Sequence, residues 1–233
     1  MIYIGTSGFI YSRWRGKFYP EDLPKSKYFE YYVNYFNSLE LNSTFYRFPK
    51  ITTIRSWKYK LKKLNDFKLS LKAHRYITHT KKLDAPRKLK EFLEVVSVLG
   101  ESLGAVLFQL PPSFKFNKER LEEFCASLDE NLKYAIEFRN QSWYRDETYE
   151  VLKAHSIAMV WHDYNQEIVF EKTADFEYVR LHGYTGKYVG SYPDEFLKEL
   201  ASKLTAGFVY FNNTDDVSAP KDALRLKEII EGK

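Results

Sequence analysis

The chain has 233 residues, of which 44% are hydrophobic and 29% are charged, so it is long enough to bury a sizeable core. Its formal net charge of +5 permits an anionic ligand but is far below that of a protein that coats nucleic acid. The single cysteine, Cys125, excludes a disulfide framework within the chain and a cysteine-based zinc site. Cys125 lies at core spacing in a helical pattern, which is typical of a buried thiol.

Two further absences concern the compartment. No run approaches 18 apolar residues, so we expect neither a membrane span nor a membrane partner. The sequence begins with a strand pattern and lacks the basic and apolar regions of a signal peptide. We therefore expect a cytoplasmic protein, and the sequence leaves its oligomeric state open.

Eight short apolar runs recur along the chain, and seven of them end in a polar side chain of a chemically useful type. Runs of this length, bounded by turn residues, are typical of buried strands. The runs are residues 2–8, 39–42, 69–74, 106–112, 135–140, 159–163, 179–183 and 209–213.

Helical patterns lie between these runs. In residues 25–36, five aromatic residues recur at the spacing of one helix face. Asn117 and Ser218 are predicted N-cap residues for two of the helices. The predicted helices are residues 25–36, 52–64, 86–101, 117–129, 144–155, 193–204 and 219–231.

The alternation of strands and helices predicts an α/β fold with parallel strands, because crossovers of this length join parallel neighbours. Eight such units close a single (βα)8 TIM-like barrel, which we predict as one domain over residues 1–233. The segment between Asp163 and Phe176 is too short and irregular for a good helix, so we predict that the sixth crossover helix is short or missing. An open doubly wound sheet is the alternative, but no G-x-G-x-x-G or Walker lysine motif supports it.

The carboxyl ends of barrel strands carry the chemistry in this architecture. Side chains two positions apart on a strand face the same way, so the runs predict several convergent pairs. Burying so many charges without a ligand or function would be costly, although ion pairs inside a barrel are a purely structural alternative. The predicted set is Glu40 with Asn42, Lys72 with His74, Glu137 with Arg139, and Arg180 with His182, joined by Gln109, His162 and Asn212.

Three kinds of chemistry suit this set, and we favour the binding of an anion followed by acid–base catalysis. Lys72, Arg139 and Arg180 would hold a phosphate or carboxylate. A carboxylate, Glu40 or Glu137, would then act as general base and a histidine such as His182 as acid.

The other two interpretations of this set are a site for a metal ion and a lysine that forms a covalent adduct. His74, His162, Asp163 and His182 could hold a divalent metal together with Glu40 or Glu137. The cations at the same strand ends and the absence of a tight ligand spacing disfavour this metal centre. Lys72 could form a Schiff base if its pKa were lowered. We predict no cofactor, and a divalent metal is the alternative.

Aromatic and basic residues interleave in the loops after the first two strand runs. Trp14 lies in GFIYSRWRGKFYP and Tyr46 in STFYRFP. Rings beside cations suit sugar rings or nucleic-acid bases, so Trp14 and Tyr46 join Asn42, Gln109 and Asn212 as predicted substrate contacts. Packing of the loops on the barrel by their rings is the alternative.

The sequence resembles the YecE-like family, also called domain of unknown function family 72. The motifs that carry the resemblance occur in order from Ile4 to Asn213, and they include IGTSGF, ELNSTFYRFP, LGAVLFQLPPSF, AIEFRNQSW and VRLHG. The resemblance implies a TIM-like barrel and supplies no reaction, although the fold of the family has been likened to metal-dependent barrels that cleave DNA at abasic sites. Its motifs also cover Thr78 and His79.

These observations together predict a barrel enzyme that acts on an anionic substrate, of the hydrolase or lyase class. The substrate would carry a phosphate or carboxylate, on a sugar or nucleic acid. A non-catalytic nucleic-acid-binding barrel and a metal-dependent phosphodiesterase are the two alternatives.

Overall fold

A computed structural model describes residues 1–164 and 167–232, and each of the eight predicted runs overlaps a strand, although seven of the strands begin before their run. The strands form one sheet in the order β1-β8-β7-β6-β5-β4-β3-β2. Ser7, just after β1, forms a parallel bridge with Glu40 of β2, so the sheet nearly closes into a barrel and the fold prediction is confirmed. The strands are β1 Ile2–Thr6, β2 Ser38–Leu41, β3 Lys68–Lys72, β4 Leu103–Gln109, β5 Tyr134–Glu137, β6 Ala158–His162, β7 Glu177–Leu181 and β8 Gly207–Phe211.

The helices follow the predicted ranges with shifted ends. The predicted helix 25–36 is split into a 3₁₀ turn, Lys25–Lys27, and α1, Tyr28–Tyr32, after which the chain tightens into i→i−3 turns at Asn34 and Tyr35. The other helices are α2 Ser43–Tyr46, α3 Ile51–Leu61, α4 Pro86–Val96, α5 Lys118–Ala126, α6 Asp146–Ala154, α7 Asp194–Lys203 and α8 Ser218–Glu231.

One of the two predicted N-caps is confirmed and the other is wrong. Asn117 Oδ1 accepts a hydrogen bond from the backbone N–H of Arg120 at 2.9 Å, which caps α5. Ser218 is instead the first residue of α8. The Asp216 carboxylate accepts from the Ser218 N–H at 2.8 Å and so satisfies the donor that a cap would have served.

The segment between β6 and β7 contains no helix among its described residues, 164 and 167–176, as predicted. Hydrogen bonds along β6 hold it in place instead. The Thr173 hydroxyl accepts from Met159 N at 2.7 Å and donates to the Ile157 carbonyl at 2.6 Å. Trp161 Nε1 donates to the carbonyl of Glu171 at 2.8 Å. An extended segment thus covers β6 where other strands are covered by a helix.

The described chain divides into two compact units. The first unit comprises Met1–Glu40, His162–Val169 and Val179–Lys233, and the second comprises Leu41–Trp161 and Phe170–Tyr178, each without its undescribed residues. No helix in residues 1–164 and 167–232 is both long and apolar enough to cross a membrane.

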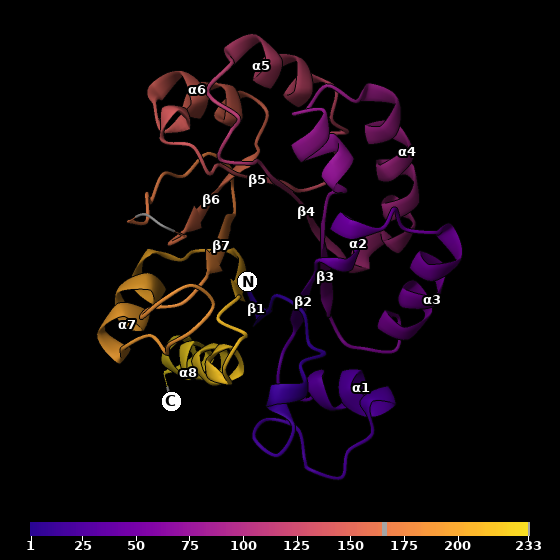
Figure 1. Cartoon of the computed structure of the whole chain (residues 1–233), viewed down its shortest axis with the longest axis vertical. Helices are drawn as coiled ribbons and strands as arrows, with labels where there is room; N and C mark the ends of the chain where they lie inside the picture. Colours follow the sequence, from indigo (N-terminus) through magenta and orange to yellow (C-terminus); the bar gives the residue numbers. More distant parts are fainter. Residues whose placement is uncertain (165–166, 233) are drawn as a thin grey trace. The chain divides into compact units, whose positions relative to one another are not determined.

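The first unit is built on the parallel pair β1 and β8, with α7 and α8 side by side, in orange and yellow in Figure 1. Gly5 of β1 lies against the first residue of β2, where a Cβ atom would fall 2.0 Å from the Ser38 carbonyl oxygen. Only glycine permits this approach. The hydroxyls of Ser38 and Tyr210 share a buried hydrogen bond of 2.5 Å.

The second unit contains β3, β4 and β5 in parallel register, with α5 and α6 as neighbours (Figure 1). Phe108 of β4 packs its ring against Phe124 of α5, with centroids 4.9 Å apart. The next residue, Gln109, points to the opposite face of the strand, as the period of two requires. Register pairs Gln109 with Glu137 of β5, which places two polar side chains on adjacent strand ends.

Candidate functional site

A buried ion pair occupies the strand ends of the first unit. Arg180 of β7 donates from Nε to Glu40 Oε2 at 2.9 Å and from Nη2 to Oε1 at 2.8 Å, so the contact is bidentate. Ser7 Oγ donates to Glu40 Oε1 at 2.5 Å. All three side chains are almost fully buried. The Glu40 carboxylate is therefore held by a matched cation and a hydroxyl.

His182 and Asp163 extend this pair. Arg180 Nη1 lies 3.4 Å from His182 Nε2, and His182 Nδ1 lies 3.2 Å from Asp163 Oδ1. The Tyr192 hydroxyl donates to the other oxygen of Asp163. We call Ser7, Glu40, Asp163, Arg180, His182 and Tyr192 the first-unit network.

Opposing effects act on the Asp163 carboxyl. Burial raises its pKa, but the hydrogen bonds and charge of His182 and the Tyr192 hydroxyl outweigh burial and leave the pKa below its ordinary value. Burial and the neighbouring Asp163 charge raise the pKa of Tyr192. Asp163 is therefore the ionised member of this contact and Tyr192 the neutral donor.

A second group of polar residues lies at the strand ends of the second unit. Lys72 Nζ donates to Gln109 Oε1 at 2.8 Å, and Gln109 Nε2 donates to the Leu110 carbonyl at 2.8 Å. Arg139 forms an ion pair with Glu137, in which both side chains are buried. The predicted pairing of Glu137 with Arg139 is therefore observed.

His79 belongs to the same group. Burial lowers its pKa to about 4, helped by the charges of Lys72, Arg75 and Arg139 and opposed by Glu137. Its ring lies 4.9 Å from that of Phe45, whose face also carries the Lys72 ammonium at 4.3 Å. We call Lys72, His79, Gln109, Glu137 and Arg139 the second-unit cluster.

Sequence reasoning gave His79 no role, although the family motifs covered it. The only signal was its place in a short segment, KAHRYITH, with two histidines after a strand. The first histidine, His74, was predicted to point with Lys72. Its ring instead lies 5.8 Å from Phe48, and burial together with Arg75 and Lys88 lowers its pKa. The prediction therefore picked the wrong histidine as the companion of Lys72.

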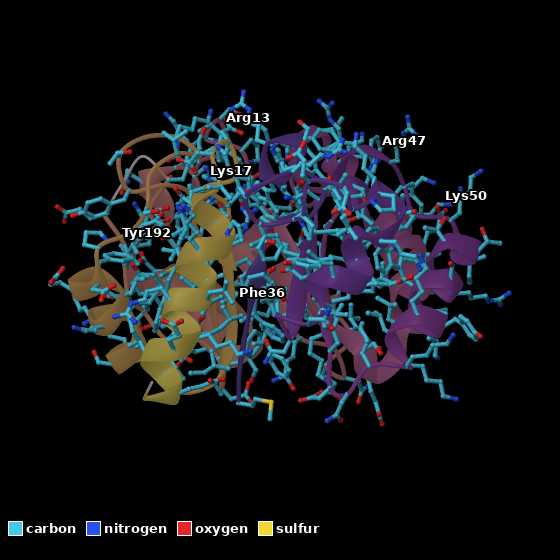
Figure 2. All side chains as sticks on the ribbon, turned by 90° about the horizontal axis from the view of Figure 1, so that it is seen from below. Arg13, Lys17, Phe36, Arg47, Lys50 and Tyr192 are labelled. Atoms are coloured by element: carbon cyan, nitrogen blue, oxygen red, sulfur yellow. The ribbon has the colours of Figure 1, made fainter. Side chains whose placement is uncertain are left out.

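Of the two aromatic residues predicted to contact a substrate, Trp14 is buried and Tyr46 is exposed. Trp14 is fully buried, donates from Nε1 to the Asp216 carbonyl at 3.1 Å and packs beside Phe18. The loop around it is thus packed by its rings, while Arg13 and Lys17 are exposed, and Arg13 lies at the edge of the view in Figure 2. Tyr46 is 69% exposed on α2.

The two predicted asparagine contacts follow strands in different units. Asn42 precedes α2 in the second unit and is half-buried. Asn212 follows β8 in the first unit, where its backbone N–H donates to the Leu181 carbonyl at 2.7 Å. Their roles in binding stay predictions.

The alternative metal ligands are also distributed over both units, with His74 and Glu137 in the second and Glu40, His162, Asp163 and His182 in the first. The rings of His162 and His182 have centroids 6.1 Å apart, and His162 Nδ1 accepts from the Tyr164 N–H at 3.2 Å. In the part of the chain that the structure describes, no three or more His, Cys, Asp or Glu side chains form a group that could hold a metal ion.

The fold and these strand-end groups define a (βα)8 barrel protein with polar side chains where such barrels carry their sites. The family model described as "Protein of unknown function DUF72" matches residues 3–233, so the chain belongs to this family, as its motifs predicted. It is similar to a crystal structure of a DUF72 family protein from Thermotoga maritima, with 32% identity, a TM-score of 0.84 and 99% of each chain covered.

Two curated relatives carry names without an activity. The chain is 27% identical over 172 residues to the UPF0759 protein YunF of Bacillus subtilis, which covers 69% of this chain and 58% of that protein. It is 27% identical over 146 residues to the UPF0759 protein YecE of Escherichia coli, which covers 62% and 50%. The matches thus span little more than half the length of these relatives.

Proposed function

We propose that the protein is an enzyme that binds the anionic group of a phosphate- or carboxylate-bearing substrate at the second-unit cluster and acts on it by acid–base chemistry. The observation that carries the proposal is the charge balance around His79. The charges of Lys72, Arg75 and Arg139 lower the pKa of this imidazole, and the charge of Glu137 opposes them. A half-buried site with this excess of positive charge favours an anion.

The contacts of the cations support the same function. Lys72 donates to an amide oxygen and lies over an aromatic face. An ammonium has three donors, so Lys72 can keep its bond to Gln109 and still donate to an anion. Glu137 orients the Arg139 guanidinium, whose fork of donors suits a phosphate or carboxylate.

His79 is the proton acceptor in this proposal. With a pKa of about 4 it is neutral at pH 7 and able to accept a proton, although it is a weak base. A bound anion would offset the charges of Lys72 and Arg139 and so raise the pKa of His79. The base would then strengthen when substrate binds. Glu137, which we predicted as a base from the sequence, is held by Arg139 and serves to position it.

The first test measures binding of inorganic phosphate by isothermal titration calorimetry at pH 7 and low ionic strength. We expect Lys72→Met to weaken binding by about tenfold or more, because it removes a charged donor without changing side-chain length. Lys68→Met is the matched control. Lys68 lies at the other end of β3 and bonds Asp66 and the Glu101 carbonyl, so its loss should leave phosphate binding unchanged. Equal affinities for wild type and Lys72→Met would rule out the anion site.

The second test addresses catalysis. Product formation is measured on a panel of phosphorylated and carboxylated sugars with wild type, His79→Gln and the exposed control His155→Gln. We expect His79→Gln alone to lose turnover while it still binds phosphate. Turnover that persists in His79→Gln would exclude the acid–base role. Salt-sensitive binding of DNA or RNA without turnover of any substrate would favour the non-catalytic alternative.

A further inference from the structure

A cavity of about 440 Å³ opens in the second unit, and none of the residues that line it belongs to the second-unit cluster. Leu41 of β2 and Leu71 of β3 form part of its lining, and Ile54 and Trp57 of α3 form another part. Both leucines and Ile54 are buried, whereas Trp57 is half-buried. The volume lies in the range of small-molecule pockets, and the mainly apolar lining with a few polar groups is also typical of them.

Charge distinguishes one edge of this cavity. Among the residues that the structure describes, Arg47 and Lys50, in the segment between α2 and α3, are the charged residues of its lining, and no carboxylate lines it. Both are exposed, and Figure 2 shows their side chains extending outward from this edge. Long side chains of this kind can reach a ligand at the cavity opening while their stems pack against its apolar part.

We propose that this cavity is a binding site for a small ligand with a flat apolar body and one anionic group. The apolar body would lie against the half-buried rings of Phe48 and Trp57, and the carboxylate or phosphate would face Arg47 and Lys50. An apolar wall favours the ring system, and two cations without a carboxylate favour the charge. The site is separate from the proposed anion site at Lys72 and does not depend on it.

One hydrogen bond links this cavity to the strand end beside it. The hydroxyl of Thr44, which lines the cavity, donates to the backbone carbonyl of Lys72 at 2.6 Å. The wall is therefore fixed to β3 by a partly buried hydrogen bond. A ligand would meet a surface that is already formed, which lowers the entropic cost of binding.

The experiment titrates the full chain with three probes of the same shape, 2-naphthoate, 2-naphthyl phosphate and the neutral 2-naphthamide, by isothermal titration calorimetry. We expect both anions to bind, and the amide to bind at least about tenfold more weakly. The two anionic probes distinguish a carboxylate from a phosphate ligand. Absence of binding by both anions, or equal affinity for the amide, would overturn the proposal.

Three sets of variants locate the bound probe. Thr53 lines the cavity from the first turn of α3 and is exposed, so Thr53→Trp should fill the space and abolish binding. Thr52→Trp, one position earlier and outside the lining, should leave binding unchanged. The exposed double variant Arg47→Gln and Lys50→Gln should reduce the affinity for the anions to that for the amide.

Lys72→Met separates the two proposed sites, because it should leave 2-naphthoate binding intact while it weakens phosphate binding. Loss of 2-naphthoate binding in Lys72→Met, with retention in Thr53→Trp, would place the probe at the second-unit cluster and overturn the cavity proposal.

Discussion

The first-unit network and the second-unit cluster use similar residue types in different ways. In the first unit, the Arg180 guanidinium meets Glu40, and the Asp163 carboxylate meets His182 and Tyr192. In the second unit, Lys72 meets an amide and a ring, and the cations around His79 outnumber the carboxylate. Charge balance, rather than the number of polar residues at strand ends, therefore distinguishes a network whose charges are matched within the protein from a site that can bind a ligand.

The balance of charge also predicts how each region responds to mutation. A buried charge that loses its matched partner is left uncompensated, which is costly to the folded state. Lys72 is half-buried, donates to an amide and lies over a ring, so its removal should affect ligand binding more than folding. Mutations in the first-unit network should therefore lower the free energy of unfolding, whereas mutations in the second-unit cluster should weaken ligand binding.

The largest expected effect follows from Glu40→Gln. This change leaves the Arg180 guanidinium buried with a neutral amide in place of its bidentate carboxylate. We expect the free energy of unfolding to fall by about 3–5 kcal/mol, measured by urea denaturation at pH 7. Glu21→Gln is the control, because its 3.7 Å contact with Arg15 is exposed and should change the free energy of unfolding by less than about 1 kcal/mol. Similar small losses in both variants would contradict the structural role of the network.

A smaller effect is expected from Asp163→Asn. Its pKa lies below the ordinary value, so the carboxylate stabilises the fold fully above about pH 4, and this stability is lost as pH falls through the folded-state pKa. At pH 7 the amide should cost about 1–3 kcal/mol, because it cannot hold His182 with a charge. The difference between wild type and variant should shrink as pH falls below 4. The free energy of unfolding of both proteins is measured by urea denaturation from pH 7 to pH 3. A difference between them that stays constant over this range would exclude the linkage.

Much of the fold could be predicted from local sequence. Each strand is a short apolar run, and the crossovers are long enough to require parallel neighbours, so the barrel followed from the count of repeated units. The sixth crossover was also predictable, because the segment is too short and irregular for a good helix, and its described residues form none. The residues at which helices begin and end were harder to predict. Ser218 has the chemistry of a cap, but the Asp216 carboxylate two residues earlier already satisfies its N–H.

The location of the candidate site could be predicted from the sequence. Which of its side chains contact one another was harder to predict. The period of two on a strand correctly placed Glu137 beside Arg139 and Arg180 beside His182. It failed for His74, because this residue lies beyond the end of β3 at Lys72, where the strand period no longer applies. His79 joins Lys72 through the turn at Tyr76–Thr80, which no strand pattern describes. Which rings pack a loop and which stay exposed, as with Trp14 and Tyr46, depends on tertiary contacts.

The smallest effect tests the second-unit cluster at His79 itself. An NMR titration of the imidazole should give a pKa of about 4 in wild type, for which burial is the first cause and Lys72 the next. Lys72→Met should raise this pKa toward the ordinary value of 6.5, because it removes a positive charge. The rise should be smaller than one pKa unit, which corresponds to less than about 1.4 kcal/mol, because burial remains. Saturating phosphate should raise it in wild type, and Lys68→Met should leave it unchanged. A His79 pKa that responds to neither Lys72→Met nor phosphate would mean that the cations do not act on this side chain, and the contrast between the two units would then disappear.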